Sequence, residues 1–371
     1  MYVSAYDYRR FLLRTDPTSP TTTALSTAAE PACPLDLAGL NAGEYAATRP
    51  VIVRILAEVA PDQDALHAMV AVLDTFTAYA ERRGVRTWPD TTTALVTSFV
   101  RCTEVDLADD ARLLRKNTVH AAYLALVDAD LQDDLSPAEG VTLVDPSARS
   151  APSVQQAGAD EEGKTRRKYS DRTHVRPATH DEITLIRLAT RFAGTTRAQH
   201  LPAAAVAICS STATTSEAPQ VLWEHLRTID GDEMVQLAGR VDENNGEEKA
   251  IARRTVPLDM WCVGALEAWR TERSEVRPVD PTLSVLYSGA QSLVSNSAQV
   301  STDKQIAKVL GIADLSDLDG LTAGSLRLWA ATRHITDLYT LDAGAAAAGI
   351  EPLTLHRHVT QQGDRGLRRS S

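Results

Sequence analysis

A segment rich in Pro, Ser, Ala and Gly divides the chain and constrains its fold more than any other feature. Residues 136–163 read SPAEGVTLVDPSARSAPSVQQAGADEEG and follow neither a helical nor an alternating pattern of hydrophobic residues, as is typical of linkers. The chain has 371 residues, which is enough for two or three domains with sizeable cores. We therefore expect one domain before this segment and another after it.

Before the linker, hydrophobic residues recur at intervals of three and four, as on a helix with one buried face. One helix is predicted from about residue 62 to Arg82–Gly84, a second over Thr91–Arg101, and a third from an N-cap near Asn117–Thr118. We assign residues 62–140 to a helical domain. The arm before it, residues 1–61, contains a long Thr-, Ala- and Pro-rich stretch, and we expect it to be loosely structured.

After the linker, Thr179–Glu182 has the Thr and Glu of a capping box and predicts the start of a helix. A further helix is predicted around residues 215–226. Strand-like stretches and dipeptides suited to hairpin turns follow, namely residues 227–230, 233–237 and 250–258 with Asp230–Gly231 and Asn245–Gly246. The remainder is mostly helical to about Val359, with breaks at 288–290, 311–320 and 342–349. We assign residues 178–371 to a second domain, mainly α with a small antiparallel β-sheet.

Charge is unevenly distributed along the chain. In total, 38 basic and 49 acidic residues give a net charge of -11, which argues against a protein that coats nucleic acid indiscriminately. The linker, which we place at residues 141–177, nevertheless contains a basic cluster with a single acidic residue, Asp171. The basic cluster consists of Lys164, Arg166, Arg167, Lys168, Arg172 and Arg176.

Several classes of protein are excluded by what the sequence lacks. No apolar run approaches the ~18–20 residues that cross a bilayer, and no signal-like segment begins the chain, so we expect a cytoplasmic protein that spans no membrane. No Walker loop, HExxH motif, nucleophile elbow or dinucleotide fingerprint is present. The cysteines lack metal-ligand or disulfide-framework spacing, and they are Cys33, Cys102, Cys209 and Cys262. We predict neither a metal nor a cofactor.

Three short motifs follow one another in the second domain. Ser216–Glu217 stands six residues before Trp223, as in the pattern SExxxLxW, and Lys249 stands five residues before RTVPL at 254–258. Leu326–Arg327 is followed by Ala331–Thr332, as in LRHTxAT. With the helical layout, these motifs resemble the tyrosine recombinase (phage integrase) family over about residues 62–360. The resemblance implies a helical SAM-like core-binding domain and a recombinase-like helical domain with a small β-sheet.

The departures from the family pattern bear on chemistry. Active members of the family attack a DNA phosphate with a tyrosine, while arginine, lysine and histidine-like side chains neutralise the developing charge. In the resemblance only Lys249 and Arg327 keep their type. The first arginine, the two histidine-like donors and the nucleophile fall in turn on Thr214, Gly324, Ile350 and Val359. We therefore predict a degenerate member with no catalytic residue.

An atypical nucleophile is the less favoured alternative. Tyr339 lies twenty residues before the expected position, and using it would require a gap in an otherwise ungapped match. His356 and His358 flank the expected position, but a histidine attacking phosphorus needs an activating environment. A metal pair formed by these two histidines is disfavoured because alternate residues on a helix point apart.

Basic residues in three places are candidates for contact with double-stranded DNA. The first group lies at the predicted helix start near Thr118, where the helix dipole would add to the positive charge, and comprises Arg112, Arg115, Lys116 and His120. A solvated charged turn balanced by Asp106, Asp109 and Asp110 is the plain alternative. The second group is the basic cluster of the linker, whose densely packed like charges favour a polyanion over a plain soluble connector.

The third group comes from the predicted hairpin and comprises Lys249, Arg253 and Arg254, with Arg327 opposite in the resemblance. The alternative is a surface hairpin whose cations pair with Glu243, Glu247 and Glu248.

Two hypotheses of different class follow. The first is a non-catalytic, sequence-selective DNA-binding protein of the nucleoid: a transcriptional regulator, a phage- or plasmid-type repressor, or an accessory architectural factor. It could associate with itself or with another recombinase-like protein. The second is a protein-interaction module in which acidic residues have replaced the DNA-binding face, in keeping with the net charge of -11. The two differ in whether Asp and Glu project into the concave face.

Overall fold

A computed structural model describes residues 43–101, 109–132, 136–139, 141, 175–244, 247–338 and 340–368. Residues 1–42 of the arm expected to be loose and residues 142–174 of the linker lie outside these residues, and so do Lys164, Arg166, Arg167, Lys168 and Arg172 of the basic cluster. Within the described residues, no helix is both long and apolar enough to cross a membrane.

The part before the linker is a bundle of four helices in the described residues. They are α3 (Tyr45–Val59), α4 (Gln63–Glu81), α5 (Thr93–Arg101) and α6 (Asp109–Asp128). Helix α4 begins where the side chain of Asp62 accepts a hydrogen bond of 2.8 Å from the amide of Ala65. Aromatic rings with centroids 4.8–6.1 Å apart fill the centre of the bundle, from Tyr45, Phe76, Tyr79, Trp88, Phe99 and Tyr123.

Two expectations for this part are wrong. The arm predicted to be loose over residues 1–61 contains α3, whose residues Val51, Ile52 and Ile55 are buried in the core. The first turn of α3 is rich in Thr and Ala, and Pro50 follows it. For this reason the apolar stripe of α3 was not recognised from the sequence. The helix predicted to begin near Asn117–Thr118 instead runs from Asp109, because packing of its later turns holds a highly charged first half in the helix.

The part after the linker is mainly helical, as predicted. Its helices are α7 (His180–Ala193), α8 (Leu201–Cys209), α9 (Met260–Val276), α10 (Asn296–Ile312), α11 (Ala323–Leu338), α12 (Leu341–Ala348) and α13 (Pro352–Arg368). The sequence analysis missed α8 because its LPAAAVAIC sequence is apolar all round and lacks a helical period. Two differences are corrections: residues 215–226 hold only two 3-10 turns, and α12 occupies the break predicted at 342–349.

A three-stranded antiparallel sheet in the order β1 (Leu226–Ile229), β2 (Asp232–Leu237) and β5 (Arg254–Pro257) confirms the predicted small sheet. A separate hairpin joins β3 (Arg240–Asn244) to β4 (Glu247–Ile251), with Asn244 opposite Glu247. Asp230 and Gly231 both have positive φ, 53° and 90°, as a type I′ turn requires. The other predicted turn, Asn245–Gly246, lies outside the described residues.

The register of the sheet separates a buried face from an outer face. Val235 pairs with Val256, and both are buried against the helices. Gln236 pairs with Thr255 on the opposite face, where Thr255 is exposed. Because side chains alternate along a strand, Arg227 of β1 lies on this outer face as well.

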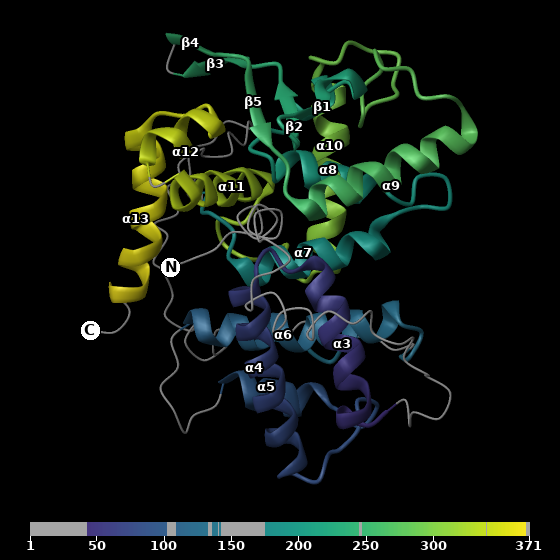
Figure 1. Cartoon of the computed structure of the whole chain (residues 1–371). Coiled ribbons are helices and arrows are strands. Elements are labelled where there is room, and N and C mark those ends of the chain that lie inside the picture. Colours follow the sequence, from purple (N-terminus) through teal and green to yellow (C-terminus); the bar gives the residue numbers. More distant parts are fainter. Residues whose placement is uncertain are drawn as a thin grey trace, which may run out of the picture.

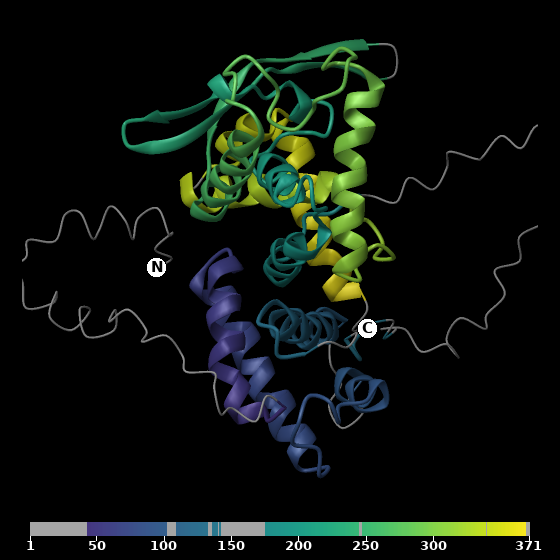
Figure 2. The same ribbon diagram turned by 90° about the vertical axis from the view of Figure 1, so that its right-hand side faces the viewer.

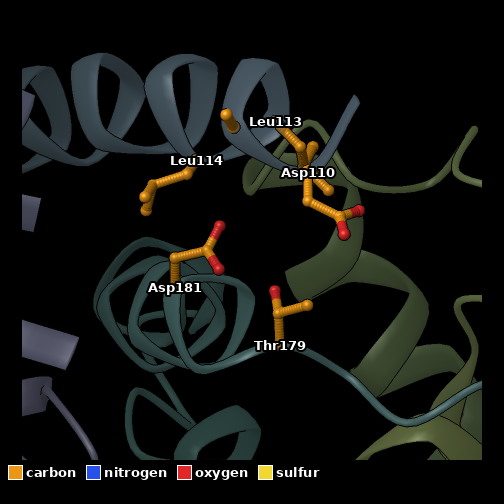
Figure 3. Close-up of a pocket in the computed structure, with 6 residues that line it drawn as sticks. Asp110, Leu113, Leu114, Thr179 and Asp181 are labelled. Atoms are coloured by element: carbon orange, nitrogen blue, oxygen red, sulfur yellow. The ribbon is translucent and has the colours of Figure 1, made fainter. Parts of the chain in front are cut away.

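The two parts of the chain meet at α6 and α7. Figures 1 and 2 show, from two directions, α3 to α6 on one side of this boundary and the sheet with α8 to α13 on the other. One hydrophobic core nevertheless includes residues of both parts, such as Val119 and Ile183. A pocket of about 280 Å³ opens at the boundary, between the start of α6 and the start of α7. In Figure 3, the carboxylates of Asp110 and Asp181 and the hydroxyl of Thr179 lie around it.

The sheet generates a prediction about two glycines that differ in their surroundings. Gly231 (φ 90°) has no atom within 4 Å of an added Cβ, whereas a Cβ on Gly239 (φ 81°) would lie 2.4 Å from the carbonyl oxygen of Ile251. Gly231→Ala should lower the free energy of unfolding by about 1 kcal/mol through backbone strain alone. Gly239→Ala should lower it by at least about 3 kcal/mol, because backbone must also move. The free energy of unfolding is measured by chemical denaturation. Equal losses in the two variants would contradict the close contact between Ile251 of β4 and Gly239 in the β2–β3 turn.

Candidate nucleic-acid interface

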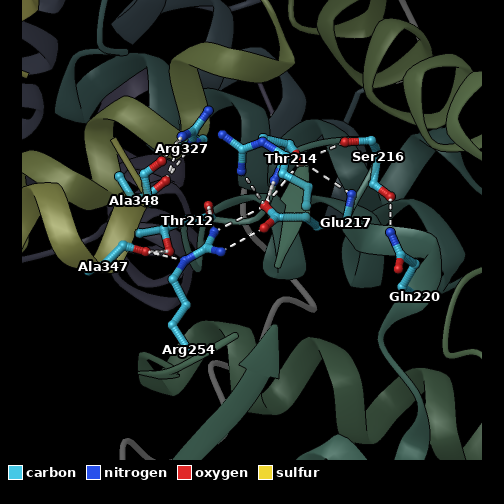
Figure 4. A network of polar contacts seen from close by, with 11 residues as sticks. Thr212, Thr214, Ser216, Glu217, Gln220, Arg254, Arg327, Ala347 and Ala348 are labelled. Carbon is cyan, nitrogen blue, oxygen red and sulfur yellow. Dashed lines mark hydrogen bonds and ion pairs between the residues drawn. The ribbon is translucent and has the colours of Figure 1, made fainter. Parts of the chain in front are cut away.

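The carboxylate of Glu217 is the centre of an arginine network, drawn in Figure 4. Arg254 of β5 donates to it from both terminal nitrogens, with Nη1–Oε1 at 2.6 Å and Nη2–Oε2 at 3.0 Å. Arg240 of β3 donates from Nη1 to Oε2 at 3.0 Å. The Glu217 side chain is 0% exposed, so its charge must be stabilised by donors within the protein.

The loop that carries Glu217 completes its coordination. The amide of Thr214 donates to Oε2 at 3.0 Å. Burial alone would raise the pKa of Glu217, but the hydrogen bonds and charge of Arg254, the Thr214 amide and the charge of Arg240 outweigh it and lower the pKa to about 2. Thr214 stands where the resemblance expects an arginine, and its hydroxyl bonds to Ser216 and Glu217 at 2.9 and 3.0 Å. The guanidinium groups that contact Glu217 come from Arg240 of β3 and Arg254 of β5, and not from position 214.

Arg254 and Arg327 also bind the C-terminal end of α12. Arg254 Nε donates to the carbonyl of Ala347 at 2.7 Å, and Arg327 Nε donates to the carbonyl of Ala348 at 3.0 Å. These carbonyls are the ones a helix end leaves without intrahelical partners, and the helix dipole makes them attractive to cations. Gly349 ends the helix in the left-handed region at φ 61°, with an added Cβ only 2.5 Å from Ile251 Cγ2. The structure thus brings Arg254 and Arg327 together and gives both a role in the fold.

Three positions that the resemblance aligns with catalytic groups of the family lie in the C-terminal helical part of the structure. Gly324 has no side chain, and Ile350 packs against a small cluster around Leu355. Val359, at the position of the nucleophile, is an exposed hydrocarbon side chain on α13. His358 Nδ1 lies 2.9 Å from the carbonyl oxygen of Val175, while Tyr339 lies outside the described residues.

Two arginines lie at the two edge strands of the sheet, Arg227 on β1 and Arg253 directly before β5. Arg227 and Arg253 are both exposed, and Arg227 Nε donates to the carbonyl of Glu224 at 2.8 Å. The pKa of His225 is lowered by burial and then by the charges of Arg253 and Arg227, partly offset by Glu224. Two arginines therefore act on one histidine, which directly precedes β1. The sequence analysis named Arg253 but missed Arg227 and Arg240, although the strand alternation around Arg227 could have placed it facing outward.

The group predicted at the start of a helix near Thr118 is placed differently by the structure. Lys116 is 7% exposed and pairs with Asp314 at 2.8 Å, and His120 is 3% exposed with Nε2 2.9 Å from the carbonyl of Ile312. Arg115 donates to the carbonyl of Phe99 at 2.7 Å. Because these residues lie inside α6, the expected contribution of a helix N-terminus at this point is wrong. Their contact with DNA stays a prediction, and in this arrangement Lys116 and His120 are covered by protein.

The structure describes the side chains of only some of the remaining predicted residues. Arg112 Nη1 lies 3.6 Å from Asp109 Oδ1 within the first turns of α6. Arg176 forms a two-pronged ion pair with the buried Glu182, with Nη1–Oε2 at 2.8 Å. Lys249 faces Asp242 across the hairpin by register, but its side chain is outside the description. Among the residues described, no group of three or more His, Cys, Asp and Glu side chains is arranged to hold a metal ion.

Comparisons with known proteins give matches to solved structures alone. No protein-family model matches the chain and a search of curated proteins gives no match. A crystal structure of XerA recombinase is 14% identical and has a TM-score of 0.38, covering 88% of this chain and 97% of its own. XerH recombinase bound to palindromic difH substrate is 13% identical with a TM-score of 0.40, covering 88% and 96%. A lambda integrase tetramer bound to a Holliday junction is 13% identical with a TM-score of 0.32, covering 92% and 80%.

These structures are recombinases and integrases, which is the family named from the motifs.

The network around Glu217 generates a prediction about pH. A carboxylate whose pKa falls from 4.5 when unfolded to about 2 when folded stabilises the fold above pH 4.5, and this stabilisation disappears as the pH falls toward 2. Glu217→Gln should therefore lower the free energy of unfolding at pH 7 by about 3 kcal/mol, and the difference from the parent should shrink in acid. Denaturant titrations over this pH range check it. Glu224→Gln is the control, since Glu224 is exposed, and a pH-independent loss in the Glu217 variant would contradict the account.

Proposed function

We propose that this protein binds double-stranded DNA and does not cut or join it. The observation that carries the binding part is the pair of exposed arginines, Arg227 on β1 and Arg253 directly before β5, at the two edge strands of the sheet. Guanidinium groups suit phosphate because their planar fork donates two parallel hydrogen bonds and keeps its charge at any physiological pH.

The sheet fixes these arginines in place. Arg227 is on a paired strand and is further held by its bond to the carbonyl of Glu224. Arg253 directly precedes Arg254, whose guanidinium is locked to Glu217 and Ala347. A network buried under the sheet therefore holds β5, which Arg253 directly precedes. The guanidinium of Arg227, held by this bond, loses little side-chain entropy when it meets a phosphate.

The absence of cleavage is inferred from the side chains at the expected reactive positions. Val359 offers no oxygen or nitrogen to attack phosphorus, so no covalent intermediate could form there. Thr214, Gly324 and Ile350 provide no cationic or imidazole donor, and each lost donor to a transition-state oxyanion typically costs ~3–4 kcal/mol. Arg327 bonds to the end of α12. We place the protein among sequence-selective regulators, repressors or accessory architectural factors.

A protein of this kind should form no covalent adduct with DNA. Duplexes that carry a nick near the binding site trap a covalent intermediate, because the cleaved fragment diffuses away before rejoining. With this protein, we expect denaturing electrophoresis to show no protein–DNA species, because the α13 position of the nucleophile is Val359. An adduct that survives denaturation would overturn the proposal, and peptide mapping would then identify the nucleophile.

The contribution of the sheet can be measured through salt. Each phosphate that a protein neutralises contributes about -0.9 to the slope of log affinity against log salt concentration. The double variant Arg227→Ala/Arg253→Ala should flatten this slope by about two units in fluorescence anisotropy with duplexes selected from random sequence. Arg270→Ala/Arg277→Ala is the matched control, because it removes two exposed arginines at α9.

If the Arg227→Ala/Arg253→Ala variant keeps the salt dependence of affinity of the parent protein, the sheet does not contact phosphate. Binding to no duplex at low salt would favour the protein-interaction hypothesis instead.

A further inference from the structure

The pocket between the start of α6 and the start of α7 combines negatively charged groups with apolar walls. The carboxylates of Asp110 and Asp181 and the hydroxyl of Thr179 lie around it (Figure 3). The apolar walls come from α6 and are Ala111, Leu113 and Leu114. Its volume of about 280 Å³ is just below the roughly 300–1,000 Å³ of pockets for small molecules, so it suits a group the size of one side chain.

The polar groups of the pocket have hydrogen-bonding capacity to spare. Asp181 Oδ2 accepts from Asn117 Nδ2 at 2.7 Å, which leaves Oδ1 for another donor. Thr179 Oγ1 is buried and has no hydrogen-bond partner within the described residues, an arrangement that costs free energy. Neither Asp110 nor Asp181 forms an ion pair within those same residues. The pocket therefore offers two negative charges and an open acceptor to a donor from outside the described residues.

A primary ammonium or guanidinium group on a hydrocarbon stem matches these features. The stem packs against the leucines while the cation reaches the carboxylates, as long basic side chains do on protein surfaces. Its N–H groups form charge-assisted hydrogen bonds with the aspartates. The positive ends of α6 and α7 also border the pocket, but each amounts to about half a charge against a full charge on each aspartate. The balance favours a cation and excludes an anion.

Arg176, the last residue of the basic cluster, shows where this cluster reaches the described protein. Its guanidinium forms the two-pronged ion pair with Glu182 in the first turn of α7 and donates from Nη1 to the carbonyl of Pro177 at 3.0 Å. Burial alone would lower the pKa of Arg176, but the hydrogen bond and charge of Glu182, followed by the charges of Asp181 and Asp110, raise it. The cluster therefore ends within electrostatic range of both carboxylates of the pocket.

The other basic residues of the cluster are tethered close to the pocket. Arg172 is seven residues and Lys164 fifteen residues before Thr179. At about 3.3–3.6 Å per residue, these stretches of chain can span at most about 25 Å and 50 Å. Short tethers of this kind give effective concentrations in the millimolar range. A side chain of the cluster therefore outcompetes free amines that are present below millimolar concentration.

We infer that the pocket between α6 and α7 binds a lysine or arginine side chain from residues 164–172 of the same chain. This contact continues the attachment that Arg176 begins at Glu182. The site itself is independent of the proposed function. Its consequence for DNA rests on that function, because a cation held by Asp110 and Asp181 is withheld from phosphate and the pocket competes with DNA for the cluster.

A peptide tests the site without DNA. The cluster variant is the full chain with Lys164→Gln, Arg166→Gln, Arg167→Gln, Lys168→Gln and Arg172→Gln. A fluorescein-labelled peptide that copies residues 163–173 should bind this variant at least about tenfold tighter than the parent, whose own cluster competes at millimolar effective concentration. Fluorescence anisotropy at physiological salt measures both affinities. Equal affinities would overturn the inference, and so would an absence of binding to the cluster variant.

Asp110→Asn in the cluster variant tests the contact with the carboxylate. Loss of this charge-assisted partner should weaken peptide binding at least about tenfold. Asp64→Asn is the matched control, since it removes an exposed carboxylate from the first turn of α4 as Asp110→Asn does from α6. It should leave peptide affinity unchanged, and thermal melts check that both variants remain folded. Equal peptide affinities in the two folded variants would show a response to overall charge alone and would overturn the site.

The consequence for DNA has a separate readout. In the parent protein, Asp110→Asn releases the cluster and should tighten binding of duplex DNA at least about threefold relative to Asp64→Asn. In the cluster variant, the two substitutions should have equal effects on duplex affinity. Equal effects in the parent as well would overturn the competition between the pocket and DNA. A parent protein that binds no duplex refutes the proposed function, and the peptide measurement still decides whether the site exists.

Discussion

The buried carboxylate of Glu217 is the interaction on which the second part of the protein depends. Without Arg240 and Arg254 it would be an unpaired charge in the interior, and with them it ties β3 and β5 to the loop that follows α8. Arg254 then continues to the end of α12, where Arg327 of α11 also binds. One acid and three arginines therefore connect the hairpin, the sheet and the C-terminal helices. A network used in this way fixes the sheet and the C-terminal helices relative to each other.

The sequence predicted those features that local patterns control. Helices α4 and α5, the capping pattern at α7 and the Asp230–Gly231 turn all follow from spacing or backbone preference over a few residues. Prediction from the sequence failed for elements whose formation depends on tertiary packing. Helix α3 contains Pro50 and a weak start, α6 begins in a charged stretch, and α8 has no polar face.

The candidate site shows the same division. The motifs placed Arg254 and Arg327 in one region, and the structure brings them together. Their acceptors are backbone carbonyls of Ala347 and Ala348, and no sequence pattern marks a helix end almost a hundred residues away from Arg254. Arg240 was missed because nothing local shows that Glu217 is buried and needs a second cation. Lys116 shows the reverse error, because a charged residue that reads as solvent-exposed is buried against Asp314.

The central claim is that an arginine-bearing sheet on this scaffold recognises DNA. Crosslinking of the native protein to DNA in the cell, followed by sequencing across the genome, tests it most directly. The account predicts discrete peaks that share a sequence, and predicts that Arg227→Ala/Arg253→Ala weakens them while Arg270→Ala/Arg277→Ala does not. Recovered DNA no more enriched than in an uncrosslinked control would contradict the claim.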